Sequence, residues 1–177
     1  MDEARHLYDQ IAKRTAGSIY IGVVGPVRTG KSTFIKRFME QLVLPNLENT
    51  YQRDRARDEL PQSGSGRTIM TTEPKFVPEQ AVEISPDGTS RLKVRLIDSV
   101  GYLVPGAMGA EEEGMPRMVM TPWSQTELPL EQAAEIGTKK VMEEHSSIGI
   151  VMTTDGSVTD IPASDYASAQ DLSLIHI

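Results

Sequence analysis

The spacing of apolar positions along the first half of the chain predicts strands alternating with a helix. Ser18–Val24 is a short run rich in Ile and Val, typical of a buried strand. Apolar residues then recur at helical spacing over Lys31–Val43, and Pro45 is expected to end that helix. Lys75–Ser85 and Arg91–Ile97 are predicted strands, and the Asp-Gly turn between them indicates a β-hairpin. The apolar stripe expected to face the core from the helix is Phe34, Ile35, Phe38, Met39 and Leu42.

The remaining segments follow the same kind of pattern. Residues 2–16 are predicted to form an amphipathic helix that ends at Gly17, and residues 46–68 a helical turn at the surface followed by a loop. Gly101–Leu128 is rich in Gly and Pro and is expected to be a loop. Pro129–His145 is predicted to be a helix, and Ser147–Thr153 a further buried strand.

The segment between the first strand and the first helix carries a phosphate-binding pattern. Gly25–Ser32 matches G-x-x-x-x-G-K-[ST] at every fixed position. The two glycines let the backbone wrap around a phosphate, Lys31 reaches the β- and γ-phosphates, and the Ser32 hydroxyl ligates magnesium. Arg28 is either a solvent-facing residue or a charge stabiliser that acts in cis or on a neighbour. The residues assigned to nucleotide binding are Gly25, Arg28, Thr29, Gly30, Lys31, Ser32, Thr33 and Gly101.

Asp98 ends a predicted apolar strand and begins the pattern D-x-x-G with Gly101. An aspartate in that place can hold a magnesium-bound water, and the glycine amide can meet a γ-phosphate. The alternative is an aspartate that merely forms a turn at the strand end. The distance of this pattern from the glycine-rich loop favours the catalytic interpretation.

Two threonines, Thr71 and Thr72, precede the strand Lys75–Ser85. In GTPase-like domains a threonine from this interval closes over magnesium and the γ-phosphate, although both could be ordinary β-formers at a strand start. Which of the two would bind is left open. The predicted catalytic residues are Lys31, Asp98, Thr71 and Thr72, and the predicted magnesium ligands are Ser32, Thr72 and Asp98.

Two familiar GTPase features are absent from the sequence. Tyr102 and Leu103 follow the D-x-x-G pattern, where many small GTPases have a glutamine that orients water. The attacking water must therefore be held in another way, or hydrolysis is slow. No Asn-Lys-x-Asp motif is present, so the motifs alone do not choose between ATP and GTP.

Together these patterns predict the fold class α/β, as a three-layer P-loop NTPase domain of the GTPase-like, TRAFAC type. The expected organisation is an N-terminal helix at 1–17, a partial NTPase domain at 18–171 and a tail at 172–177. We expect the domain to be truncated at its C-terminal end, because the chain is short for this fold by roughly a third. The tail matches one reading frame of an adapter used in sequencing libraries, which favours non-native read-through.

Composition excludes several other classes of protein. The formal net charge is −7, which argues against a non-specific nucleic-acid binder. The absence of cysteine excludes disulfides, cysteine zinc sites and thiol catalysis. No apolar run approaches the roughly 18 residues of a membrane span, and no secretory signal is visible.

Several blocks beyond the generic loop resemble the stage IV sporulation protein A family, and the similarity covers about residues 5–170. These blocks lie at 19–25, 27–36, 58–63, 68–78, 98–106, 137–141, 144–146 and 153–156. The resemblance implies a GTPase-derived fold that binds ATP and Mg2+, hydrolyses ATP and polymerises as the base of the spore coat of endospore-forming Firmicutes. Lys31 and Ser32 would then bind phosphate and magnesium, Asp98 would be the Walker B acid, and Thr71 and Thr72 the switch threonines.

The same resemblance implies a place and partners. Family members work in the mother-cell cytoplasm, peripherally at the outer forespore membrane, where a small amphipathic membrane peptide recruits them and other spore coat morphogenetic proteins bind. No nucleic-acid partner is expected. Family members are much longer, with further regions that serve polymerisation and localisation. The alternatives are a regulatory GTPase of the ribosome-assembly type and a scaffold that nucleotide stabilises without turnover.

Overall fold

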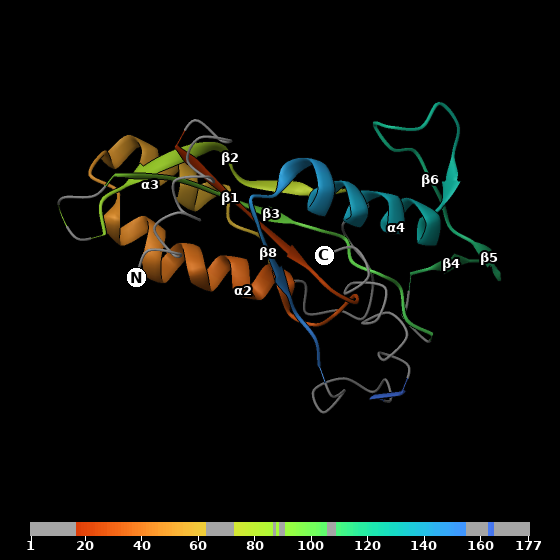
Figure 1. Ribbon diagram of the computed structural model, residues 1–177. Helices are drawn as coiled ribbons and strands as arrows, with labels where there is room; N and C mark the ends of the chain where they lie inside the picture. The colour runs from red at the N-terminus through yellow and green to blue at the C-terminus, as the bar shows by residue number, and fades with distance from the viewer. Residues whose placement is uncertain are drawn as a thin grey trace.

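The computed structural model of the protein describes residues 17–62, 73–86, 88, 91–105, 109–154 and 163–164, arranged around one main sheet (Figure 1). The strand order in that sheet is β2-β3-β1-β8. Its strands are β1 (Ser18–Val24), β2 (Lys75–Ile84), β3 (Leu92–Asp98) and β8 (Ile148–Val151). β1 runs parallel to β3 and β8, whereas β2 and β3 form the predicted antiparallel hairpin. The bounds of β1, β2 and β3 agree with the sequence prediction to within one residue.

Helices cover both faces of this sheet, so the described chain has the predicted three layers (Figure 1). Ile21 and Val23 of β1 face the layer that contains α2 (Lys31–Phe38), whereas Val24 faces the opposite layer. That opposite layer contains α4 (Leu130–Lys140) and a π-helical turn, Val141–His145, that continues it. The alternation follows directly from the period of two along a strand.

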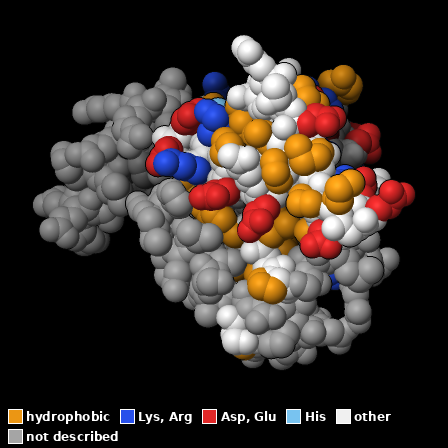
Figure 2. Space-filling model, turned by 90° about the vertical axis from the view of Figure 1, so that its right-hand side faces the viewer, with side chains coloured by type: hydrophobic (Ala, Val, Ile, Leu, Met, Phe, Trp, Pro, Cys, Tyr) orange, Lys and Arg blue, Asp and Glu red, His pale blue; other side chains and the backbone are white. Residues whose placement is uncertain are grey.

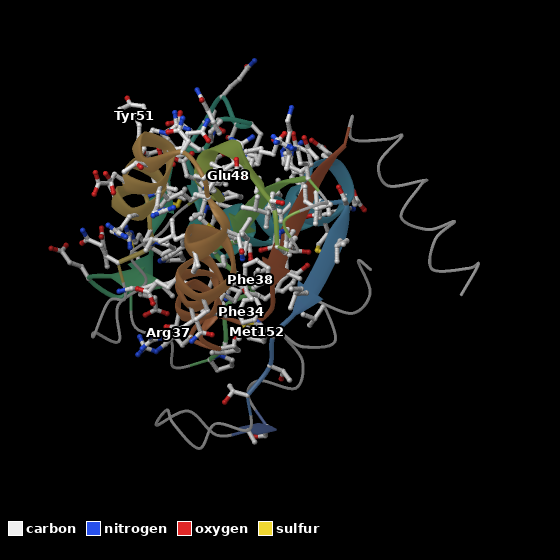
Figure 3. All side chains as sticks on the ribbon, turned by 90° about the vertical axis from the view of Figure 1, so that its left-hand side faces the viewer. Phe34, Arg37, Phe38, Glu48, Tyr51 and Met152 are labelled. Carbon is white, nitrogen blue, oxygen red and sulfur yellow. The ribbon has the colours of Figure 1, made fainter. Side chains whose placement is uncertain are left out.

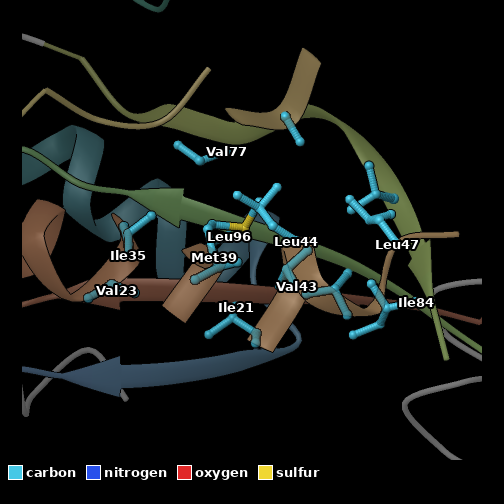
Figure 4. Close-up of a cluster of buried hydrophobic side chains, with 13 residues drawn as sticks. Ile21, Val23, Ile35, Met39, Val43, Leu44, Leu47, Val77, Ile84 and Leu96 are labelled. Atoms are coloured by element: carbon cyan, nitrogen blue, oxygen red, sulfur yellow. The ribbon is translucent and has the colours of Figure 1, made fainter. Parts of the chain in front are cut away.

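The main core lies between α2 and the sheet (Figure 4). Ile35 and Met39 are fully buried against Val23 of β1 and Leu96 of β3. Burying an aliphatic side chain of this size contributes about 1.5–3 kcal/mol relative to exposure. This core therefore fixes the start of α2, and the loop that precedes it, against the ends of β1 and β3.

The helix that begins at Lys31 differs from its prediction at the far end. α2 continues as a π-helical turn, Met39–Val43, and a 3-10 turn, Leu44–Asn46, so Pro45 lies within the helical path instead of ending it. Proline is tolerated there because it occupies the first turn of a new helical segment. The wider π turn also changes the phase of the stripe. Val43 is buried, whereas Leu42, predicted to face the core, is 51% exposed.

The polar segment after this helix contains more structure than the predicted single turn. α3 (Thr50–Asp58) is a helix of nine residues. Asn49 caps it, because its side-chain oxygen accepts a hydrogen bond of 3.1 Å from the Gln52 amide. The helix buries only Ala56 and leaves its charged residues at the surface, which explains why no apolar stripe indicated it.

The segment Gly101–Leu128, predicted as a loop, contains four strands of two residues each. They are β4 (Glu111–Glu112), β5 (Met115–Pro116), β6 (Met118–Val119) and β7 (Leu128–Pro129). They pair as β4 with β5 and β6 with β7. Strands this short leave no alternation for a sequence pattern to reveal.

Figure 2 views the side on which Figure 1 shows β4, β5 and β6, and hydrophobic side chains lie exposed there among acidic ones. Met115, Met118 and Met120 are exposed.

The last described strand, β8, exists as predicted, but the prediction that it is buried is wrong. Ile148 is 36% exposed, and the described part of the sheet ends at β8. Beside this edge, Phe34 and Phe38 of α2 and Met152 after β8 pack only partly buried against the core (Figure 3). The apolar sequence of β8 is typical of a strand that is buried on both faces. In the described chain, one side of β8 is only partly covered.

Some predictions fall outside the described residues. The helix at 2–16, the threonines Thr71 and Thr72 and the tail at 172–177 are among them. The domain boundaries likewise stay a prediction. Among the helices that the structure describes, none has the length and apolar character needed to cross a bilayer.

Candidate functional site

The candidate site is the loop that joins β1 to α2, here called the 25–30 loop. Gly25 and Gly30 have φ angles of 139° and 87°, in the region that favours glycine. A Cβ on Gly25 would also collide with the backbone oxygen of Met152, at the end of β8. Gly30 stands at the N-terminus of α2, and its carbonyl accepts a hydrogen bond of 2.8 Å from the Phe34 amide. Both glycines are therefore required by the backbone path.

Lys31 lies over this loop instead of pointing into solvent. Its side chain is 5% exposed, and Nζ donates a hydrogen bond of 2.7 Å to the carbonyl oxygen of Pro26. The same oxygen accepts a bond of 2.9 Å from the Thr29 hydroxyl. Burial lowers the pKa of Lys31 to about 8, although the nearby Asp98 opposes the shift. The ammonium group is thus held at the loop and still carries its charge at neutral pH.

Asp98 ends β3 directly beside α2. It is buried, receives a hydrogen bond from the Ser32 hydroxyl, and its Oδ1 atom has no hydrogen-bond partner. Burial raises the pKa of Asp98, while the bond from Ser32 and the charges of Lys31 and Lys75 act in the opposite direction. Lys75 stands opposite Asp98 in the register of β2 and β3. The structure thus brings Lys31, Ser32 and Asp98 together.

This donor set fits a magnesium ion that is held mainly by phosphate. An orphaned buried carboxylate oxygen beside a serine hydroxyl offers two oxygen ligands, and magnesium commonly takes the rest from phosphate and water. Over the ranges that the structure describes, no group of three or more His, Asp or Glu side chains could hold a metal alone. The Asp98 carboxylate and the Ser32 hydroxyl would hold such an ion together with a bound nucleotide.

The segment that follows Asp98 lies directly against the 25–30 loop. Gly101 has a φ of 91°, and a Cβ there would collide with the oxygen of Gly25 and with Nζ of Lys31. The Val27 amide donates a hydrogen bond of 2.8 Å to the oxygen of Tyr102. Gly101 thus approaches the loop more closely than any residue with a side chain could.

A small apolar core supports this contact. Val27 and Tyr102 pack with Val104, with Val119 of β6 and with Leu130 of α4. Tyr102 is 3% exposed, and burial, with Glu135 and Glu143 nearby, raises its pKa to about 12. The residue after the D-x-x-G pattern is therefore a buried packing residue.

Sequence reasoning missed three backbone oxygens that accept hydrogen bonds at the site. Ser99 donates a hydrogen bond of 2.9 Å to the oxygen of Val23, which ties the end of β3 to β1. The oxygens of Pro26 and Tyr102 accept the bonds described above. Every residue has a backbone carbonyl, so residue type does not reveal which of them accepts a hydrogen bond. The hydroxyl of Ser99, directly after Asp98, is a feature of the sequence that could have indicated one of these bonds.

Arg28 and Thr33 are the remaining predicted site residues in the described chain. Arg28 has a φ of 65°, a left-handed conformation that costs a residue with a Cβ about 1–2 kcal/mol, and its side chain is half-buried. Thr33 lies in the first turn of α2 with its side chain exposed. The structure therefore does not bring the Thr33 side chain into the group around Lys31.

Comparisons with known proteins agree with one another. The family described as "Stage IV sporulation protein A, ATPase domain" matches residues 1–176. Relatives with the name "Stage IV sporulation protein A" are 61% identical over 94% of this chain in Clostridioides difficile (strain 630) and 60% identical over 93% in Bacillus anthracis. The Bacillus subtilis (strain 168) relative is 58% identical over 93% of this chain. No solved structure matches the chain.

The shared region is one part of those relatives. In each of the three, the matched region covers 34% of the relative's length, so the chain spans about a third of the curated proteins it matches.

Proposed function

The chain belongs to the stage IV sporulation protein A family, and from that premise we propose that it binds ATP with Mg2+ and hydrolyses it in a P-loop NTPase domain of the GTPase-like type. The observation that carries this proposal is the grouping of Lys31, Ser32 and Asp98 at the 25–30 loop, with Gly101 against it. The ATPase description of the matched family supports ATP over GTP as the substrate.

Each residue in this group has a defined task. The backbone of the 25–30 loop and the N-terminus of α2 offer amide groups to the phosphate chain. Lys31 moves its ammonium from the oxygen of Pro26 to the β- and γ-phosphates. Asp98 and Ser32 hold the magnesium-bound end of the nucleotide, and the amide of Gly101 meets the γ-phosphate. Bound magnesium supplies charge neutralisation along the phosphates.

Turnover in this proposal is slow and serves assembly. The place of a water-orienting glutamine holds the buried Tyr102, so the attacking water lacks that group. We propose that ATP hydrolysis by the whole protein drives its self-assembly into a polymer at the forespore surface, as the base of the spore coat. The relatives' shared name supports a role in sporulation. Thr71 and Thr72 remain the proposed switch threonines.

The test uses the full-length protein that the gene encodes. Magnesium-dependent hydrolysis of ATP and of GTP is measured in parallel, and the same samples are sedimented. We expect ATP to be preferred, and Lys31→Ala to abolish both hydrolysis and ATP-dependent pelleting. Arg37→Ala is the matched control, because Arg37 lies exposed on the same helix and forms a surface ion pair with Glu40.

Two outcomes would replace the proposal. A preference for GTP with no pellet leaves a regulatory GTPase. Tight nucleotide binding with no hydrolysis, and with assembly unchanged in Asp98→Ala, leaves a scaffold that nucleotide stabilises.

A further inference from the structure

Arg28 holds a backbone conformation that its residue type disfavours. Its φ of 65° is left-handed, like the positive φ angles of Gly25 and Gly30 in the same loop. Glycine would adopt this conformation without strain, as it does at those two positions. Outside this loop, the described residues contain one other non-glycine with positive φ, Glu113, in a surface turn next to Gly114. Strained residues of this kind cluster at active sites and ligand-binding segments.

The loop around Arg28 is fixed from several directions. The Val27 amide is bonded to the oxygen of Tyr102, and the Thr29 hydroxyl to the oxygen of Pro26. Both neighbours of Arg28 in the sequence are therefore anchored, and both are buried. The backbone at Arg28 is thus held in place while its long side chain is only half-buried. Because its backbone is held in place, the Arg28 side chain begins at a fixed position in the loop, where a substrate phosphate would bind.

Besides the amide of Gly101, the segment opposite the loop contributes side chains at 102–104 that are engaged in an apolar core. Tyr102 and Val104 are buried in the apolar core with Val27, and Leu103 packs against the same core. Arg28 is a cation within the 25–30 loop, and Lys31 follows directly at the start of α2. Lys31 is needed for the bound phosphates, so Arg28 is a second cation that can stabilise negative charge arising during the reaction.

We propose that Arg28 is a catalytic residue that stabilises the transition state of ATP hydrolysis from within the phosphate-binding loop. The inference rests on the proposed function and adds to it a second cation for the same site. In the reaction, a water oxygen bonds to the γ-phosphorus, and the bond from that phosphorus to the β–γ bridging oxygen breaks. The electron pair stays on ADP, and the proton of the water leaves with the phosphate product. The Arg28 guanidinium donates hydrogen bonds to the bridging oxygen and to the γ-phosphoryl oxygens as charge builds there.

Arginine suits this task better than lysine. The guanidinium stays charged at any working pH and offers several donors in one plane, which match two phosphate oxygens at once. A lysine ammonium is a single point of charge on a flexible stem. The proposal therefore predicts that charge alone at position 28 does not restore turnover.

The experiment compares the full-length wild type with Arg28→Gly and Arg28→Lys. Glycine relieves the backbone strain, so Arg28→Gly is expected to melt at the wild-type temperature or above it. Its affinity for a fluorescent ATP analogue with Mg2+ should stay close to wild type, because backbone amides and Lys31 remain. Single-turnover hydrolysis of labelled ATP should fall about a hundredfold, the usual effect of losing one preorganised donor. Arg28→Lys should fall nearly as far. Arg37→Lys is the matched control and should hydrolyse ATP like wild type.

The outcomes separate this inference from the proposed function. Wild-type turnover that persists in Arg28→Gly overturns the role of Arg28 and leaves the ATPase standing. A loss of turnover that comes with an equal loss of nucleotide affinity also overturns it, because Arg28 would then only bind substrate. A wild-type protein that hydrolyses no nucleotide sinks the proposed function, and the role of Arg28 with it.

Discussion

At the scale of single residues, Lys31 is a buried cation whose charge depends on what lies in the loop. Without nucleotide, its ammonium rests on the oxygen of Pro26, and burial lowers its pKa to about 8. Bound phosphates add negative charge beside it and raise that pKa again. The free protein therefore loses this proton at a lower pH than the complex does.

The consequence is a pH dependence of nucleotide affinity. As pH rises from 7 to 9, it passes through the pKa of free Lys31, and binding must then take up a proton. We expect the affinity for a fluorescent ATP analogue with Mg2+ to weaken about tenfold over this interval, as linkage requires. Equilibrium titrations at several pH values measure it.

Lys31→Arg is the control for this measurement, because a guanidinium keeps its proton throughout the range. Its affinity, whatever its absolute value, should vary less between pH 7 and 9. A wild-type affinity that stays constant over the interval would contradict the assignment of the shifted group to the phosphate site.

The sequence could predict which side chains meet at this site but not how the backbone holds them. Lys31, Ser32 and Asp98 are recognisable because their chemistry depends on residue type and spacing. The oxygens of Pro26 and Tyr102 act through backbone atoms that every residue has, so no pattern reveals them. Thr71 and Thr72 lie outside the described residues and stay a prediction.

At the scale of elements, strands with clear alternation were predictable and short or irregular ones were not. β3 agrees with prediction because Leu92, Val94 and Leu96 alternate with the polar Lys93 and Arg95, and the Asp-Gly turn marks its hairpin with β2. β4 to β7 have two residues each, too few to show a period. The π turn Met39–Val43 likewise depends on hydrogen bonding that apolar spacing does not encode, which is why Val43 took the buried place expected for Leu42.

The hairpin of β4 and β5 should be dispensable for folding. Its side chains at 111–116 are exposed, and the Arg117 amide already donates a hydrogen bond of 2.8 Å to the oxygen of Ala110 at its base. Replacing 111–116 by Asn-Gly would close the chain there with a two-residue turn. We expect the melting temperature to change by less than about 4 °C, measured by circular dichroism.

The comparison for this deletion is Leu130→Ala, which empties a fully buried position of the core beneath the loop. That change should cost about 2–5 kcal/mol and lower the melting temperature much further. A deletion as damaging as Leu130→Ala would mean that the hairpin is part of the folding unit.

At the scale of the whole molecule, the feature that stands out is the edge at β8. β8 has an apolar sequence, Ile-Gly-Ile-Val, but it is exposed to half-buried in the described chain. Unpaired strand edges with apolar side chains tend to pair with other chains. This edge is therefore the part of the described sheet most open to pairing with another chain.

For the 177-residue chain alone, this edge predicts slow self-association. Ile148→Lys places a charge on the exposed edge and should reduce light scattering during prolonged incubation, with little effect on the melting temperature. Gln41→Lys adds the same charge at an exposed position of the π turn and is the control. If both variants reduced light scattering by the same amount, the effect would come from net charge and not from the β8 edge.

The packing at Gly137 of α4 gives the protein an optical property. A Cβ there would lie 3.2 Å from the indole ring of Trp123 and 3.3 Å from the ring of Pro74. Trp123 is the only tryptophan in the sequence, so all indole fluorescence comes from this one place. Pro74 lies two residues after Thr72. The emission of the unlabelled protein is therefore an intrinsic spectroscopic signal from the packing of α4 beside Trp123 and Pro74, free of any attached dye.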